Sequence, residues 1–395
     1  LYEKYLALVT ISLNRVHGVD QSIDYWRIIV GPWLHYFISI SLDRYETVRI
    51  AAKNYDIKYT ELPVYEIDEW VPIDYVDFNE KYYSDEWNYY LFSEIIKYTQ
   101  LVNTKKSPYE LSPNNITTKN RKISLVKSLL FFLTKLTRNF YKKVLFVEVD
   151  IPQTYLYKLL YRLKSLSFSY YLRVRPNYHP LDHNIRDSFF EQTERNTMFE
   201  GLLDSLIPIN IPTTYLEGFK EAEEKAKKIF PSKVEVVITS NAYFSNEHFK
   251  LWVANQKLHC SQLWVLVHGG HHGTALFNGP AKLTEDIADR FYCWGWGQYN
   301  LPSPKLSSLR PYKLTQSANN ILFIPYSISK YSNHIDSSPI ASSFDDCLKM
   351  HCNFFEALKE INLNHKILIR LKSGFVLRNL EEEYYQQSGL TNFVY

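Results

Sequence analysis

The sequence predicts an α/β protein with two domains built on parallel sheets, and three observations support this class. Its 395 residues exceed what one hydrophobic core usually holds. Short apolar runs of strand length alternate with helical segments, as in parallel sheets. The alternation restarts after a segment rich in Pro, Ser, Leu and Asn. We expect an N-terminal domain over 1–298, a linker over 299–318, and the start of a C-terminal domain over 319–395.

The N-terminal part is expected to be helical before the first sheet begins. Apolar residues at helical spacing run from Leu6 to Val16, and His17-Gly18 ends the pattern. A second helix with a broad apolar face follows around Trp33 and Phe37. The acidic and aromatic segment 55–87 has few long periodic runs, so it is expected to form loops and short helices packed on the surface.

Four short apolar runs are expected to form the first parallel sheet. They cover residues 144–149, 234–239, 263–267 and 290–294, with helices expected near 155–166, 215–230 and 246–256, and a further strand near 170–174. In the second domain, strands are expected at 321–325 and 366–371, on either side of a helix at 344–360.

Composition excludes several classes of protein. The net charge of +3 does not call for a nucleic-acid partner, and four cysteines without C-x-x-C spacing suit reduced thiols in a cytoplasmic protein. No secretory signal and no apolar run of membrane-spanning length is present in this sequence. Because the chain begins at Leu1 without Met and stops abruptly at Tyr395, it is expected to be a fragment.

A basic amphipathic helix is expected over residues 119–143, which contain eight basic residues and no acidic one. One interpretation is peripheral contact with an anionic membrane surface. The alternative is a helix that faces the core and has a solvated basic side.

The strongest candidate site is an apolar strand that runs into a Gly-rich turn at His268, Gly269, Gly270, His272 and Gly273. Ligands bind outside the carboxyl ends of parallel strands, and glycines let backbone N–H groups approach an anion. A histidine there can act as a base or bind a phosphate. The alternative is a tight turn whose histidine bonds nearby backbone. A metal site is disfavoured, because the glycines break any helix that would align the histidines.

Five further residues are candidates for the same cleft. Ser240 and Asn241 end the preceding strand, although this segment also suits a helix N-cap. Glu285 and Asp289 are four residues apart on a predicted helix and either could act as a base, or else form a solvated face or an ion pair with Arg290. Arg370 ends a strand of the second domain and either clamps a phosphate or is an ordinary surface arginine.

The chain resembles a transferase family of bacterial surface-carbohydrate loci that is named after a Leptospira protein. The motifs that carry the resemblance cover most of the chain in the expected order: Leu13-Asn14, His17-Gly18, Tyr25-Trp26, Gly31-Pro32-Trp33-Leu34, Asp43-Arg44-Tyr45, Ile211-Pro212, Tyr215-Leu216-Glu217-Gly218, Thr239-Ser240-Asn241-Ala242-Tyr243, Phe249-Lys250, Trp252-Val253-Ala254, His268-Gly269-Gly270, Asp289-Arg290-Phe291, Trp294-Gly295-Trp296 and Leu368-Ile369-Arg370.

The resemblance implies a GT-B-like glycosyltransferase with two Rossmann-like domains. It implies a nucleotide-sugar donor, a glycan or lipid-linked acceptor, His268 as the catalytic base, and no bound metal or cofactor. The alternatives are a phosphotransferase that uses a CDP-glycerol-type donor, and a protein that binds a glycan or partner without catalysis. The chain departs from the family at Val267, where Gln is usual, and at His272, where Tyr is usual. The resemblance also implies that the first strand and most of the second domain are missing, and with them part of the donor pocket.

Overall fold

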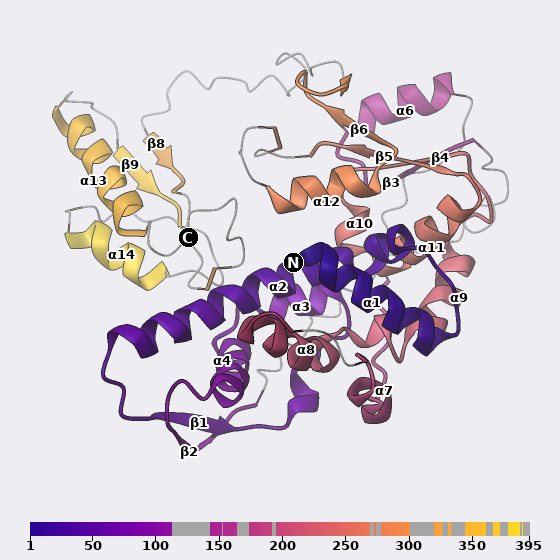
Figure 1. The fold of residues 1–395 in the computed structure, drawn as a ribbon. Coiled ribbons are helices and arrows are strands. Elements are labelled where there is room, and N and C mark those ends of the chain that lie inside the picture. The colour runs from indigo at the N-terminus through magenta and orange to yellow at the C-terminus, as the bar shows by residue number, and fades with distance from the viewer. Residues whose placement is uncertain are drawn as a thin grey trace.

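The computed structural model confirms a mixed α/β fold with parallel sheets (Figure 1). It describes residues 1–112, 143–151, 153–163, 174–191, 195–268, 272–273, 278–300, 320–325, 331–332, 344–360, 366–371, 378–387 and 389. Gly269, Gly270, residues 119–142 of the predicted basic helix, 170–173 of the predicted strand and 301–318 of the predicted linker lie outside the described residues.

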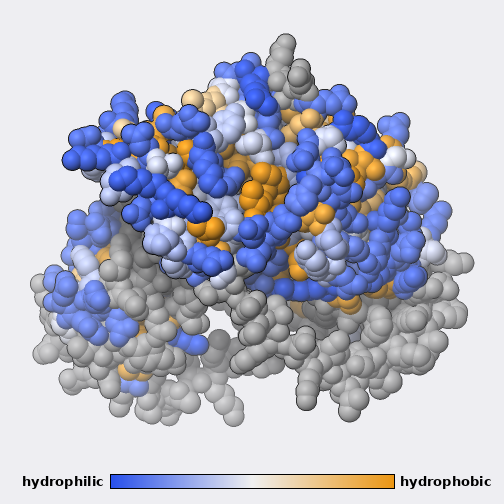
Figure 2. Space-filling model, turned by 90° about the horizontal axis from the view of Figure 1, so that it is seen from below, coloured by the Kyte–Doolittle hydropathy of each residue, from blue (hydrophilic) through white to orange (hydrophobic). Residues whose placement is uncertain are grey.

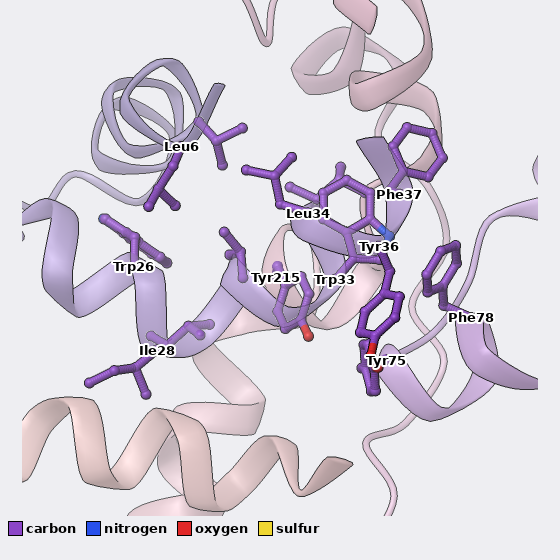
Figure 3. Close-up of a cluster of buried hydrophobic side chains, with 14 of the residues drawn as sticks. Leu6, Trp26, Ile28, Trp33, Leu34, Tyr36, Phe37, Tyr75, Phe78 and Tyr215 are labelled. Carbon is purple, nitrogen blue, oxygen red and sulfur yellow. The ribbon is translucent and has the colours of Figure 1, made fainter. Parts of the chain in front are cut away.

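The first two helices form as predicted. α1 (Tyr2–His17) ends at Gly18, whose φ of 66° lies in the left-handed region that glycine adopts without strain. α2 (Ile23–Asn54) begins after Ser22, whose hydroxyl accepts a hydrogen bond from the Tyr25 N–H. α2 is the centre of the helical layer, and Figure 3 shows Trp33 and Phe37 beside Phe78 of a neighbouring helix.

The prediction that 55–87 packs on the surface is wrong. β1 (Thr60–Val64) pairs in parallel with β2 (Thr104–Glu110), and such non-local pairing leaves no periodic signal within 55–87. The remaining elements here are η1 (Ile67–Trp70), α3 (Tyr75–Lys81) and α4 (Asp85–Thr99). Trp70, Phe78 and Trp87 are buried in the same core as α2. Large aromatic rings supply enough apolar area to bury even short helices.

The central sheet contains the four strands that the apolar runs at 144–149, 234–239, 263–267 and 290–294 predicted. They are β3 (Val144–Val147), β4 (Val236–Thr239), β5 (Gln262–Leu266) and β6 (Arg290–Cys293), and they lie side by side in sequence order. Tyr299 and Asn300, which the sequence assigned to the linker, form β7 beside β6. The other helices of this part of the chain are α6 (Gln153–Arg162), α7 (His183–Asp187), α8 (Met198–Asn210), η3 (Thr213–Tyr215), α9 (Phe219–Ile229), α10 (Ala242–Ser245), α11 (Glu247–Leu258) and α12 (Gly279–Ile287).

Helices cover the two faces of the central sheet unequally (Figure 1). One face packs its Leu145, Val237 and Val265 into the large core shared with α2 and α11. On the other face, Leu156 and Leu160 of α6 contact apolar side chains of β3, β4 and β5. The sheet is therefore the middle layer of three.

The C-terminal part forms a β–α–β unit, as the sequence predicted. β8 (Asn320–Phe323) and β9 (Lys366–Ile369) pair in parallel, and α13 (Phe344–Glu360) and α14 (Arg378–Gln387) pack around a small core with them. Buried Arg44 of α2 reaches toward this part, because its Nη1 donates to the Ser332 carbonyl at 2.6 Å. Its guanidinium lies 5.5 Å from the centre of the Tyr331 ring.

A buried ionic network joins α3 to the start of α11. The Lys250 ammonium lies 2.8 Å from a carboxylate oxygen of Glu247, and both side chains are at most 1% exposed. Lys250 also donates to the Tyr215 hydroxyl at 2.6 Å. Asp74 is buried nearby, and the charge of Glu247 acts on its carboxyl group. The negative charges of Glu247 and Asp74 both favour the charged form of the buried Lys250.

Replacing Asp74 with asparagine is expected to stabilise the protein above pH 6. Burial, with a smaller contribution from the charge of Glu247, raises the pKa of Asp74 from 3.8 to about 6. Between these values the folded state keeps a proton that the unfolded state has lost, so the free energy of unfolding falls as pH rises. Asparagine stays neutral and can still accept from the Asp77 N–H. Urea denaturation at pH 7.5 should show a gain of up to ~3 kcal/mol that shrinks toward pH 4.5. Equal stabilities at pH 7.5 would contradict this prediction.

Candidate functional site

The carboxyl ends of four parallel strands bring polar and aromatic side chains to one edge of the central sheet. Val147 is opposite Thr239, Thr239 is opposite Val265, and Leu266 is opposite Tyr292. The residues that follow these strands therefore share one edge: Glu148 and Asp150 after β3, Ser240 and Asn241 after β4, His268 after β5, and Trp294 and Trp296 after β6. Open parallel sheets bind ligands at this edge.

His268 has the properties of a base at this edge. It is half-buried, and desolvation lowers the pKa of its imidazole below the usual value, while the negative charge of Asp150 opposes that shift. The ring is therefore neutral at pH 7 and able to accept a proton. Its centre lies 5.6 Å from that of His272 in an edge-to-face arrangement.

Glu148 and Asp150 belong to the site and were not singled out from the sequence. Glu148 is a buried residue with a φ of 47°, and its Oε1 accepts a hydrogen bond from Asn246 at 2.9 Å. A left-handed conformation at a residue other than glycine is costly and is concentrated at functional sites. The signal was available, because Glu148 directly follows the apolar residues that form β3 and Asp150 comes two residues later.

Ser240 and Asn241 lie at this edge as predicted, but their neighbours do the helix capping. Ser240 is buried, and its hydroxyl accepts from the Asp150 N–H at 2.9 Å, so it fixes the backbone beside Asp150. The Thr239 hydroxyl accepts from the Ala242 N–H at the start of α10. The Asn246 side chain caps α11. Asn241 is half-buried.

Aromatic rings extend the edge from His272 toward Trp296. The rings of His272 and Phe291 are 5.6 Å apart between centres, and those of Phe291 and Trp296 are 6.0 Å apart. Trp296 also lies so close to Gly273 that an added Cβ would come within 2.6 Å of its ring. Gly273 is thus required for Trp296 to hold this position. Trp296 remains 44% exposed and can stack on a ligand.

The structure separates Glu285 from Asp289. α12 ends at Ile287, so the two residues do not share a helical face as the sequence predicted. Asp289 lies at the amino end of the strands, where it accepts from the Leu263 N–H at 2.6 Å and pairs with Lys257 at 2.8 Å. Asp289 therefore does not lie at the same end of the strands as His268. Its ion pair is with Lys257, whereas the ion pair expected from the sequence was with Arg290. Glu285 is exposed on α12, and its charge adds to the burial that raises the pKa of Cys293 to about 11.

Arg370 lies in the separate β8–β9 sheet, where its N–H donates to the Phe323 carbonyl at 3.0 Å and its side chain is exposed. A role for Arg370 across a cleft therefore stays a prediction. Among the described residues, no group of three His, Cys, Asp or Glu side chains could hold a metal ion. None of the helices in the described ranges is both long and apolar enough to cross a membrane.

Comparison with known proteins identifies a family. The model of the LIC12162 family transferase matches residues 1–379. No curated protein and no solved structure gives a match. The family match spans the helical layer, the central sheet with its polar edge, and the C-terminal unit up to the start of α14. The chain belongs to the LIC12162 family of transferases.

Proposed function

We propose that this transferase moves a sugar from a nucleotide-sugar donor to a hydroxyl of a glycan or lipid-linked acceptor during synthesis of a bacterial surface carbohydrate. The observation that carries the proposal is a neutral, half-buried His268 beside Asp150 at the carboxyl edge of a parallel sheet. Exposed Trp294 and Trp296 at the same edge offer flat apolar faces of the kind that pack on sugar rings. Transfer of a sugar to a hydroxyl group uses such a base to take the proton of that hydroxyl.

The proposed reaction is a direct displacement. The acceptor hydroxyl attacks the anomeric carbon as His268 takes its proton, and the bond from that carbon to the donor phosphate breaks. The nucleotide leaves with the electron pair and the negative charge. Asp150 stabilises the imidazolium that forms, because its carboxylate favours the protonated ring. Gly269, Gly270 and Arg370 are the proposed donors to the leaving phosphate, through backbone N–H groups and a guanidinium.

A panel of nucleotide sugars tests this function. The full-length protein is incubated with each donor and an acceptor glycan, and released nucleotide and product mass are measured. One donor class is expected to give free nucleotide and a product heavier by one sugar residue. A product that contains a phosphodiester would instead indicate transfer of a phosphoglycerol-type group. If no nucleotide is consumed and none raises the melting temperature, the proposal fails and binding without catalysis is favoured.

Two glycine variants test whether this edge is the site. Gly273→Ala is expected to displace Trp296 and reduce turnover by roughly 10- to 100-fold, because small misplacements of a binding group are costly. Gly18→Ala is the matched control, since Gly18 also has a positive φ, of 66°, nothing lies within 4 Å of its added Cβ, and it follows α1, away from this edge. Equal losses in both variants would mean that backbone strain, and not the position of Trp296, limits turnover.

A further inference from the structure

α6 exposes more apolar surface than its packing on the sheet explains. Leu156 and Leu160 are buried against β3, β4 and β5. The other large apolar side chains of this segment point outward, and each is at least 37% exposed: Tyr155, Tyr157, Leu159, Tyr161 and Leu163. Tyr161 is the extreme case, at 84% exposed. Exposed apolar side chains that gather on one short segment, and are not scattered singly, mark an interaction surface.

α6 lies in a strongly basic part of the sequence. Residues 111–181 contain thirteen Lys and Arg but only two acidic residues, Glu148 and Asp150, whereas the rest of the chain has 32 basic and 40 acidic residues. α6 itself carries exposed Lys158 and Arg162 and no acidic residue. The Lys158 ammonium lies 5.9 Å from the centre of the Tyr155 ring. The surface therefore fits a partner that is anionic and also accepts aromatic and leucine side chains.

We propose that α6 is a docking surface for an anionic lipid bilayer. Tyrosine rings have an apolar body and a polar tip, and they favour the level of the lipid headgroups. Lysine and arginine beside them reach the phosphates with their charged ends while their stems stay on apolar surface. A polyanion such as a nucleic acid would use Lys158 and Arg162 but would leave Leu159 and Leu163 without a partner.

The same face of the central sheet continues the docking surface. Trp264 and Tyr292 pack at the margin of the core beneath α6. The Arg290 guanidinium lies 4.7 Å from the centre of the Trp264 ring and 5.3 Å from that of Tyr299. Aromatic rings interleaved with a cation thus extend from α6 across β5, β6 and β7, which widens the surface beyond one helix.

Docking through α6 would hold the candidate site close to the bilayer. α6 begins at Gln153, three residues after Asp150 at the carboxyl edge of β3. This consequence rests on the proposed function, since it matters only if the acceptor is lipid-linked. The docking itself does not depend on which group the enzyme transfers, so vesicle binding and turnover can fail separately.

Co-sedimentation with vesicles tests the aromatic part of the surface. The full-length protein is expected to bind vesicles of phosphatidylcholine and phosphatidylglycerol at seven to three, and to bind pure phosphatidylcholine at least tenfold more weakly. Tyr157→Ser with Tyr161→Ser should weaken binding about tenfold, because both rings are more than half exposed. The matched control is Tyr89→Ser with Tyr109→Ser, whose rings are 51% and 58% exposed.

The control tyrosines lie on the opposite side of the molecule, where β1, β2 and α4 meet (Figure 1). They line a groove together with Glu61 and Phe92. Figure 2 shows this underside of the molecule, where orange apolar side chains are surrounded by blue hydrophilic ones. The control pair should therefore bind vesicles like the unmodified protein.

Variants that remove charge test the contribution of Lys158 and Arg162 to vesicle binding. Lys158→Gln with Arg162→Gln should weaken binding to the anionic vesicles by roughly tenfold or more, since each cation near an anionic leaflet contributes severalfold. Lys53→Gln with Lys58→Gln, two exposed lysines at the end of α2 and just before β1, should not. The proposal is overturned if the unmodified protein does not bind anionic vesicles, if the α6 variants bind them like their controls, or if only the charge variant matters and heparin competes fully. Circular dichroism melts identify any variant that fails to fold, and Leu159→Ser then replaces the tyrosine pair.

Discussion

Replacing His268 with alanine is expected to reduce turnover by about 10²- to 10⁴-fold, which is the usual contribution of a general base. The acceptor hydroxyl then has to lose its proton to water. Substrate binding should change less than turnover, because the ring acts mainly while the proton moves. Initial rates with the donor identified from the panel, compared as kcat and KM, measure the effect. His259→Ala is the control, since His259 is exposed in the turn after α11 and should leave kcat unchanged.

The pH profile of turnover gives an independent test of His268. A base is active when it is unprotonated, so the rate should fall as the pH drops through the pKa of His268, which desolvation holds below its ordinary value. The acidic limb of the profile should therefore lie below pH 6.5. Asp150→Asn removes the charge that raises this pKa, so the limb should move to lower pH. If His268→Ala keeps full turnover, or if the limb does not move in Asp150→Asn, His268 is not the base.

Local patterns predicted the central sheet well. The runs that became β3 to β6 are short, apolar and bounded by polar residues, so each carries its signal within itself. β1 and β2 were missed because Thr60 pairs with Thr104. Pairing between residues so far apart in the sequence leaves no pattern within either segment. The short helices after β1 were misplaced on the surface for a related reason. Their buried residues are single aromatic rings such as Trp70 and Phe78, which create no periodic run.

The candidate site was predictable only where it follows directly from strand order. His268, Ser240 and Asn241 were found because they end apolar runs, and the same rule applied to β3 would have found Glu148 and Asp150. The prediction that Asp289 shares a helical face with Glu285 was wrong for a different reason. A spacing of four implies a shared face only while the helix continues, and α12 has ended two residues before Asp289. Side-chain contacts such as that of Trp296 with Gly273 depend on the packed fold and leave no sequence signal.

Replacing Lys250 with methionine is expected to lower the free energy of unfolding by ~3–5 kcal/mol. Methionine fills a similar volume but leaves the Glu247 carboxylate buried without its ammonium, at a site where both side chains are at most 1% exposed. The Tyr215 hydroxyl and the Tyr75 N–H donate to Glu247 at 3.0 and 3.1 Å, which compensates only part of the charge. Urea denaturation at pH 7 measures the loss.

An exposed ion pair of the same residue types supplies the control. Lys227 is 59% exposed and pairs with Glu223 on α9, so Lys227→Met should cost less than about 1 kcal/mol. Adding Glu247→Gln to Lys250→Met should restore part of the stability, since glutamine accepts the same hydrogen bonds without a charge. The prediction is contradicted if Lys250→Met lowers the free energy of unfolding no more than Lys227→Met does. It is also contradicted if the double variant loses as much stability as Lys250→Met and Glu247→Gln lose together.

The buried pair also has a consequence for the site, because it holds the first turn of α11. Asn246, directly before that turn, caps the helix and donates to Glu148 at the carboxyl edge of β3. Removing the Lys250 ammonium should therefore disturb the left-handed backbone at Glu148 before the protein unfolds. The change should also reach Asp150, two residues later. Lys250→Met is expected to lose turnover at temperatures where its circular dichroism is still native, whereas Lys227→Met is not. Full activity up to the melting transition would show that the network stabilises the fold without positioning the edge.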